Sequence, residues 1–208
     1  MIAEGIRQAN ERLQPARIGW TVVDASEFTN CRRWILRQDK MRSDPFGGLT
    51  VRAMMHPGHQ NASYIGPSGP VDTGLSLLSV QASDGQPLAM FANLSMHYYG
   101  SGALSADFCG AFSEIFAKQI EAKDGFVAAM SQGTSGDLQW MDYSQPRPSR
   151  DVRAYSTRLA ALAKSAWDDI QYRDWVSLAM AEAKVKFQRR GADEKRLAWA
   201  RKLTEGLA

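Results

Sequence analysis

The sequence contains few of the residues that build metal sites and disulfide frameworks. Its 208 residues include two cysteines, Cys31 and Cys109, and three histidines, His56, His59 and His97. The cysteines lie far apart and show no Cys-x-x-Cys spacing, so neither a disulfide framework nor a zinc ribbon is indicated. We therefore expect both thiols to act as small buried side chains.

A strong charge of either sign and a long apolar run are also missing. The chain has 25 basic and 22 acidic residues, a net charge of +3, and this balance gives no indication of a nucleic-acid partner. The basic residues near the end, from Lys184 to Lys202, are expected to form a solvated face. No apolar run is long enough to cross a bilayer, and residues 1–7 have the charge rhythm of an amphipathic helix rather than of a signal peptide. The sequence thus predicts no transmembrane segment and leaves the compartment open.

Apolar residues are abundant enough for a core, and their periodicity alternates between helix and strand. The hydrophobic content of 44% over 208 residues predicts one domain spanning residues 1–208. We expect helices over about 2–13, 105–120, 150–170 and 197–203, and strands over 18–22, 49–54, 75–80, 88–96, 126–130 and 183–187. The Asp84-Gly85 pair predicts a hairpin turn between the third and fourth of these strands. The fold class is therefore α/β, a mixed sheet flanked by helices.

One histidine follows a predicted strand. The apolar run from Phe91 to Met96 ends on His97, whereas His56 and His59 lie in a Pro/Gly-rich segment without a periodic pattern. A polar ring at the end of a buried strand typically points into a cleft, where an imidazole can bind a metal ion. A lone histidine at a strand end is more often a hydrogen-bonded core residue, so both interpretations stay open. The sequence indicates His97 as the one histidine held by a scaffold.

A glycine-rich loop follows the strand predicted over 126–130. Residues 133–139 read Gly-Thr-Ser-Gly-Asp-Leu-Gln. Backbone N–H groups of such a loop can hold an oxyanion or a phosphate, but the lysine of a P-loop is missing and Ser135 lacks the flanks of a nucleophile elbow. A tight turn that uses glycine at positive φ is an equally good interpretation. This loop and the His97 loop both follow predicted central strands, at the end where ligands bind in open α/β sheets, and they mark a candidate site.

Six motifs follow one another along the chain, and their order resembles a known family. They are Asn30-Cys31-Arg32-Arg33-Trp34, Gly69-Pro70-Val71-Asp72, Asp84-Gly85-Gln86-Pro87-Leu88-Ala89, His97, Ser105-Ala106-Asp107 and Gln132-Gly133-Thr134-Ser135-Gly136-Asp137. As a series they are similar to the neutral/alkaline ceramidase family, from about Ala16 to Phe187. No single motif is specific. The resemblance implies the central portion of a ceramidase-like catalytic domain.

The resemblance assigns expected roles to particular residues. Members of the family are zinc amidases that cleave the N-acyl bond of a sphingolipid, and His97 stands at the position of one zinc ligand. Arg32 stands at the arginine near the substrate, and Asp107 is expected on the substrate-binding side. Gly136 and Asp137 stand at the family's Gly-Asp loop beside the zinc. The resemblance therefore implies a zinc cofactor and a small-molecule or lipid-amide substrate.

The chain departs from the family at points that affect the chemistry. Where active ceramidases carry a catalytic serine after the Gly-Asp pair, this chain has Gln139, whose amide can bind a carbonyl or a water but cannot be a nucleophile. The family's Asp-x-His-x-His segment is expected before residue 1, and its glutamate and tyrosine ligands after residue 208. One histidine does not complete a zinc site, which needs three protein ligands.

Two functions remain open at this point. We expect a ceramidase-like hydrolase of an amide bond that is incomplete, and therefore inactive, as an isolated chain. The alternative is a non-catalytic relative that binds a small polar ligand in the retained cleft. The family is usually secreted or periplasmic, although no export signal is visible in this chain.

Overall fold

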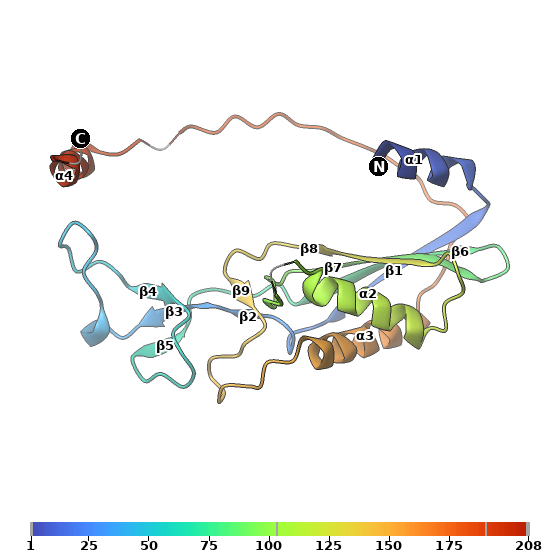
Figure 1. The fold of residues 1–208 in the computed structure, drawn as a ribbon, viewed down its shortest axis with the longest axis horizontal. Coiled ribbons are helices and arrows are strands. Elements are labelled where there is room, and N and C mark those ends of the chain that lie inside the picture. Colours follow the sequence, from blue (N-terminus) through green and yellow to red (C-terminus); the bar gives the residue numbers. More distant parts are fainter. Residues whose placement is uncertain (1, 103, 190, 207–208) are drawn as a thin grey trace.

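In the computed structural model, residues 2–102, 104–189 and 191–206 are described, and they form a mixed α/β fold (Figure 1). The helices are α1 (Ile2–Glu11), α2 (Asp107–Gln119), α3 (Val152–Asp168) and α4 (Glu194–Thr204), with a 3₁₀ turn over Gln38–Lys40. The strands are β1 (Ala16–Asp24), β2 (Asn30–Cys31), β3 (Arg33–Leu36), β4 (Ala53–Met55), β5 (Tyr64–Pro67), β6 (Gly74–Ala82), β7 (Pro87–Leu94), β8 (Val127–Gln132) and β9 (Leu138–Gln139). The predicted fold class, a mixed sheet flanked by helices, is confirmed.

The main sheet has four strands in the order β1-β6-β7-β8. β1 and β7 both pair antiparallel with β6, and β8 pairs parallel with β7. The hairpin predicted between β6 and β7 is confirmed: Gly85 has φ +89° and donates its N–H to the carbonyl of Ala82 at 2.9 Å. A turn residue at positive φ favours glycine. Because β7 and β8 are parallel neighbours, the segments that follow them both begin at the same end of the sheet, where the two strands have their carboxyl ends.

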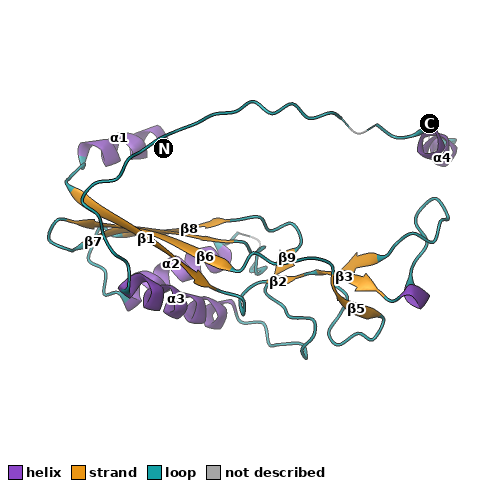
Figure 2. Cartoon of the chain, turned by 180° about the vertical axis from the view of Figure 1, so that it is seen from behind, coloured by secondary structure: helices purple, strands orange, loops and turns teal. Residues whose placement is uncertain are grey.

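Helices α2 and α3 cover one face of this sheet (Figure 2). The buried side chains of α2 lie there, and they are Phe108, Phe112, Ile115 and Phe116. They pack with Leu75, Leu77, Met90, Ala92 and Leu94 of the sheet and with Leu159, Ala160 and Ala163 of α3. Burial of each large apolar side chain contributes roughly 1.5–3 kcal/mol, so this layer is the main source of stability. The opposite face of the sheet exposes large apolar side chains: Trp20, Val22, Leu78, Phe91 and Val127.

Two small sheets extend the fold beyond the ends of β1 and β6. β2 pairs with β9, and β3 lies between β4 and β5. The strand predicted over 49–54 begins later, at Ala53, and only Val51 of its first half makes a bridge, to Arg42. The sequence pattern did not predict β2, β3, β5 and β9, which are at most four residues long. Strands this short carry too few residues for a periodic pattern to identify them.

The prediction of a strand over 183–187 is wrong. Residues 175–189 are extended but have no partner strand among the described residues, and Val185 and Phe187 are exposed. Alternating polarity predicts a strand with one buried and one exposed face. A strand forms, however, only where a neighbouring strand pairs with its backbone N–H and C=O groups. This segment leads to α4, where Trp199 packs edge-on against Phe46 with ring centroids 4.9 Å apart.

The terminal helices lie away from the core. The apolar residues expected on one face of α1 are exposed, as Ile2 and Ile6 show. In the described part of the chain, no helix has both the length and the hydropathy needed to cross a bilayer.

Candidate functional site

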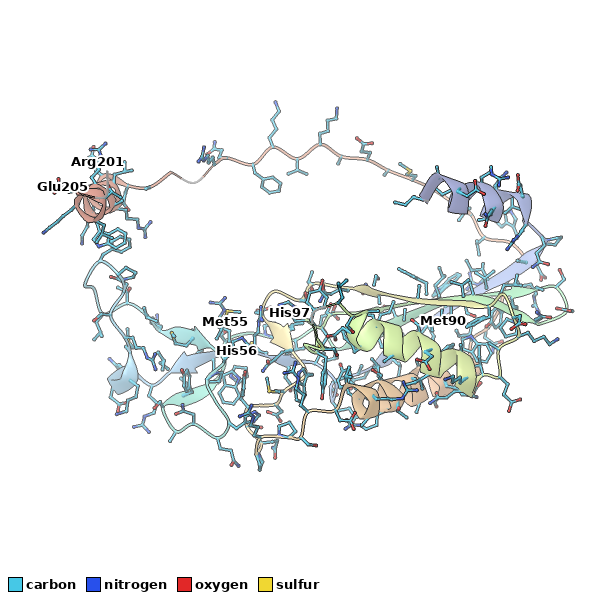
Figure 3. The ribbon with its side chains drawn as sticks, viewed as in Figure 1. Met55, His56, Met90, His97, Arg201 and Glu205 are labelled. Carbon is cyan, nitrogen blue, oxygen red and sulfur yellow. The ribbon has the colours of Figure 1, made fainter. Side chains whose placement is uncertain are left out.

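A cavity lies beyond the end of β7, at the end of the sheet predicted to hold the site. Its volume is about 440 Å³, and it is lined by Arg32, His56, His97, Tyr98, Tyr99, Gln139, Trp140, Met141, Arg147, Pro148 and Arg150. His56 and His97 lie near each other between the four-stranded sheet and the β3–β5 sheet (Figure 3). Residues far apart in the sequence therefore converge at one place.

Arg32 is held by the glycine-rich loop. Its Nε and Nη2 donate to the carbonyl oxygen of Gly136 at 3.2 and 2.7 Å, and its backbone N–H donates to the carbonyl of Asp137 at 2.7 Å. The pairing of β2 with β9 places these two segments side by side. The carbonyl oxygens of Gly136 and Asp137 therefore orient Arg32. The side chain of Asp137 takes no part in these contacts, and the residue is exposed.

Gln139 is the buried polar residue of the cavity wall. Only 4% of its surface is exposed, and its Nε2 donates to the carbonyl of Met141 at 3.4 Å. It follows the Gly136-Asp137 pair on β9 and lies opposite Asn30 of β2. The carboxamide is a fixed hydrogen-bonding group at the cavity, suited to binding a carbonyl or a water.

His97 lies three residues beyond the end of β7 and lines the cavity as the sequence predicted. Its Nδ1 accepts the backbone N–H of Tyr98 at 2.9 Å. Because Nδ1 is the acceptor, the neutral ring carries its proton on Nε2. In this orientation the ring offers a donor, whereas a metal ligand needs a free lone pair.

His56 also lines the cavity, so the prediction that His97 alone is held by a scaffold is wrong. His56 follows β4 directly, and its Nδ1 is 2.8 Å from the hydroxyl of Tyr143. Burial lowers the pKa of His56, and the charges of Arg32 and His97 lower it further, so the ring is neutral at neutral pH. The sequence pattern did not indicate this position, because β4 is three residues long and Pro57-Gly58 follows His56.

Burial raises the pKa of Tyr143, which a hydrogen bond from Gln139 and the charge of Arg32 partly offset. The Tyr143 phenol is therefore neutral at neutral pH. His59, by contrast, packs on the ring of Tyr143, bonds the carbonyl of Gln145 at 2.9 Å, and is outside the cavity lining. His59 instead lines a neighbouring pocket together with His56 and Tyr143.

Asp107 orders the loop that follows His97. Its carboxylate accepts the backbone N–H groups of Tyr99, Gly100, Ser101 and Phe108 at 2.7–2.9 Å. Burial would raise the pKa of Asp107, but these four hydrogen bonds outweigh it and the pKa is lowered. Asp107 has φ +52°, in a region where Asn and Asp are enriched among non-glycine residues. Direct contact of Asp107 with a substrate stays a prediction, whereas its contacts here show a residue that positions the cavity wall.

The described residues do not fit a zinc site. Among them, no group of three or more His, Cys, Asp or Glu side chains is arranged to hold a metal ion. His97 could supply one ligand only after its ring turned away from the Tyr98 N–H. The zinc expected from the resemblance therefore has no complete ligand set in this part of the chain.

The cysteines are also unsuited to nucleophilic chemistry at this site. Both are free, and neither lines the cavity. Burial raises the pKa of the Cys109 thiol to about 11, so it stays protonated at neutral pH.

Two arginines of the site were not predicted from the sequence. Arg147 and Arg150 lie in the segment Gln145-Pro146-Arg147-Pro148-Ser149-Arg150, which leads into α3. Arg150 donates through Nη2 to the carbonyl oxygens of Tyr99 and Gly100. The sequence shows arginines next to prolines in this loop. It contains no periodic pattern from which the position of the loop relative to the cavity could be predicted.

Comparison with known proteins identifies the fold. No known family profile matches the sequence, and no curated protein does. The structure is similar to a neutral ceramidase from Pseudomonas aeruginosa, with a TM-score of 0.55 and 20% identity over 81% of this chain and 25% of the ceramidase chain. It is also similar to a ceramidase complexed with C2, with a TM-score of 0.53 and 19% identity over the same shares. The resemblance to ceramidases is thus confirmed at the level of the fold, and the chain spans about a quarter of the ceramidases it matches.

Proposed function

We propose that this chain forms the substrate-holding wall of a ceramidase-like hydrolase that cleaves an amide (N-acyl) bond. The observation that carries the proposal is the convergence of Arg32, His97 and Gln139 on one cavity. Two of these residues lie in segments joined by the β2–β9 ladder, and the third follows the central strand β7. This convergence occurs in a fold similar to that of neutral ceramidases.

The proposed reaction is the addition of water across an amide. The C–N bond breaks, the acyl carbon gains the hydroxyl of the water, and the amine leaves with a proton. Arg32 and Gln139 provide N–H donors for the oxygen that becomes negative as water adds. His56, whose lowered pKa keeps it neutral, can accept the proton of the attacking water. Gln139 binds the amide carbonyl but does not attack it.

The only ground for a zinc ion in this proposal is the resemblance of the sequence to the ceramidase family. A bound zinc ion would polarise the amide carbonyl. Because the described residues supply no set of three ligands, the roles above are assigned to side chains alone. A zinc ion at His97 would need ligands from outside the described residues.

The test compares the chain alone with the chain completed by the flanking segments of the Pseudomonas aeruginosa ceramidase. We expect mass spectrometry to detect acid and amine released from an N-acyl amide by the completed protein and not by the chain alone. Arg32→Gln and His97→Gln should each lower turnover by roughly tenfold or more, the size of effect that removal of one positioned group typically has.

The matched control is His59→Gln, which changes a histidine outside the cavity and should leave turnover unchanged. A completed protein that folds and binds zinc but releases no acid from any N-acyl amide would overturn the proposal. So would turnover by the chain alone that survives both cavity substitutions.

A further inference from the structure

The cavity collects positive charge. Arg32, Arg147 and Arg150 line it together with His56 and His97, and none of the lining residues is acidic. Three guanidinium groups around 440 Å³ produce a positive potential that favours an anion. A cavity for a neutral amide would not need three arginines.

These arginines are not neutralised by ion pairs. In the parts of the chain that the structure describes, no carboxylate lies within 4.0 Å of the guanidinium of Arg32, Arg147 or Arg150. Arg32 and Arg150 instead donate to backbone carbonyl oxygens, which orient the guanidinium groups and leave their full charge in place. Each guanidinium has five N–H donors, so donors remain for a ligand.

Two carboxylates beside the segments that Arg150 contacts have other partners. The carboxylate of Asp107 accepts four backbone N–H groups. The carboxylate of Asp151, next to Arg150, caps α3 by accepting the N–H groups of Arg153 and Ala154. Backbone amides therefore occupy both of these carboxylates, and neither pairs with a cavity arginine.

From this arrangement we infer that the cavity binds the oxyanionic group, a carboxylate or a phosphate, of its ligand. Planar guanidinium groups match both anions with paired hydrogen bonds, and Nε2–H of His97 adds a donor. The inference rests on the proposed function only in taking this cavity as the substrate site. It then specifies the substrate as an N-acyl amide with a negative charge near the scissile bond, rather than a neutral N-acyl amine.

The test uses the full chain and three probes: N-acetylglycine, its neutral counterpart N-acetylglycinamide, and inorganic phosphate. We expect NMR titration to show saturable binding of N-acetylglycine or phosphate and at least tenfold weaker binding of N-acetylglycinamide. Binding of N-acetylglycine alone would identify a carboxylate site, and binding of phosphate alone a phosphate site. Affinity should fall as salt is raised from 0.05 to 0.5 M, because Arg147 and Arg150 are exposed.

Arg147→Gln is the informative variant, since no described contact gives Arg147 a structural role. It should weaken anion binding roughly fivefold or more, because hydrogen bonds to charged groups are strong, and Arg147→Lys should restore part of the loss. Arg12→Gln removes the same charge at an exposed residue just after α1 and should leave anion binding unchanged. Equal binding of the neutral probe, or equal weakening by Arg12→Gln, overturns the inference.

The two proposals fail separately. Anion binding at the arginines without amide hydrolysis by the completed protein would overturn the proposed function and leave this inference standing. Hydrolysis with no preference for a charged substrate and no effect of Arg147→Gln would overturn this inference alone.

Discussion

The guanidinium of Arg32 donates two hydrogen bonds to the carbonyl oxygen of Gly136, a residue 104 positions later in the chain. With the Arg32 N–H bonded to the Asp137 carbonyl, this contact fixes the loop that leads to Gln139. The same loop thus orients the arginine and supplies the buried amide of the cavity. Loss of this contact should loosen both.

We expect Arg32→Gln to lower the free energy of unfolding by about 1 kcal/mol, the size of a partly exposed charge-assisted hydrogen bond. The larger effect should be local, with faster hydrogen exchange at the amides of Leu138 and Gln139. Arg33→Gln, on an exposed neighbour, is the control. Unchanged exchange at Leu138 in the Arg32 variant would show that the loop is held by other contacts.

The close packing at Gly133 leads to a second prediction. A Cβ at this position would lie 2.4 Å from Ser95 Oγ and 3.2 Å from Asn93 Oδ1, where the loop after β8 passes the end of β7. Gly133→Ala should destabilise the protein by roughly 1–3 kcal/mol, because Ser95 Oγ must move and give up its hydrogen bond to the Asp72 carboxylate, and Ser95 Cα also lies within 3.2 Å.

Gly136→Ala is the matched control, since a Cβ there has no atom within 4 Å. We expect it to change the free energy of unfolding by less than about 0.5 kcal/mol in urea titrations. Equal stability of the Gly133 and Gly136 variants would mean that the loop does not approach Ser95 this closely.

Asp107 predicts a dependence of stability on pH. The hydrogen bonds that lower its pKa stabilise the folded protein above the unfolded pKa of about 3.9, and this contribution is lost as the pH falls through the folded pKa. Asp107→Asn should therefore cost about 1 kcal/mol at pH 7, and the difference from the unsubstituted protein should shrink between pH 4 and pH 2. Asparagine tolerates the positive φ of this position, so the backbone conformation is retained.

Urea unfolding at several pH values checks this prediction. Asp137→Asn, on an exposed residue of the other loop, should show no such pH-dependent difference. A difference for Asp107→Asn that stays constant down to pH 2 would show that the carboxylate charge is not what the four amides stabilise.

Local signals in the sequence predicted the core of the fold, and non-local pairing explains the errors. The β6–β7 hairpin was predictable because its alternation and its Asp84-Gly85 turn lie in adjacent residues. β3 and β5 were missed because each is too short to show a period, and the extended segment around Val185 was assigned to a strand because alternation says nothing about a partner.

The candidate site was predicted only in part, because some of its residues carry a local signal and others reach the cavity through non-local contacts. His97, Arg32 and Gln139 were found from a strand end and from motifs in series, and all three line one cavity. Arg147 and Arg150 were not found, because their loop reaches the cavity through contacts such as that of Arg150 with the carbonyl of Tyr99. No pattern within residues 145–150 contains that information.

The final prediction concerns zinc and the orientation of His97. Because Nδ1 accepts the Tyr98 N–H and the described residues supply no third ligand, the chain alone should bind zinc weakly and lose it on dialysis. Metal analysis after dialysis, followed by zinc titration, measures both properties. What binding remains should disappear in His97→Ala and persist in His59→Ala, the matched change outside the cavity. Stoichiometric zinc that survives dialysis and is indifferent to His97→Ala would place the metal elsewhere, with His56 and His59 the first residues to substitute. Retention of zinc that needs His97 would instead require the ring to turn and release the Tyr98 N–H, which hydrogen exchange at Tyr98 would detect.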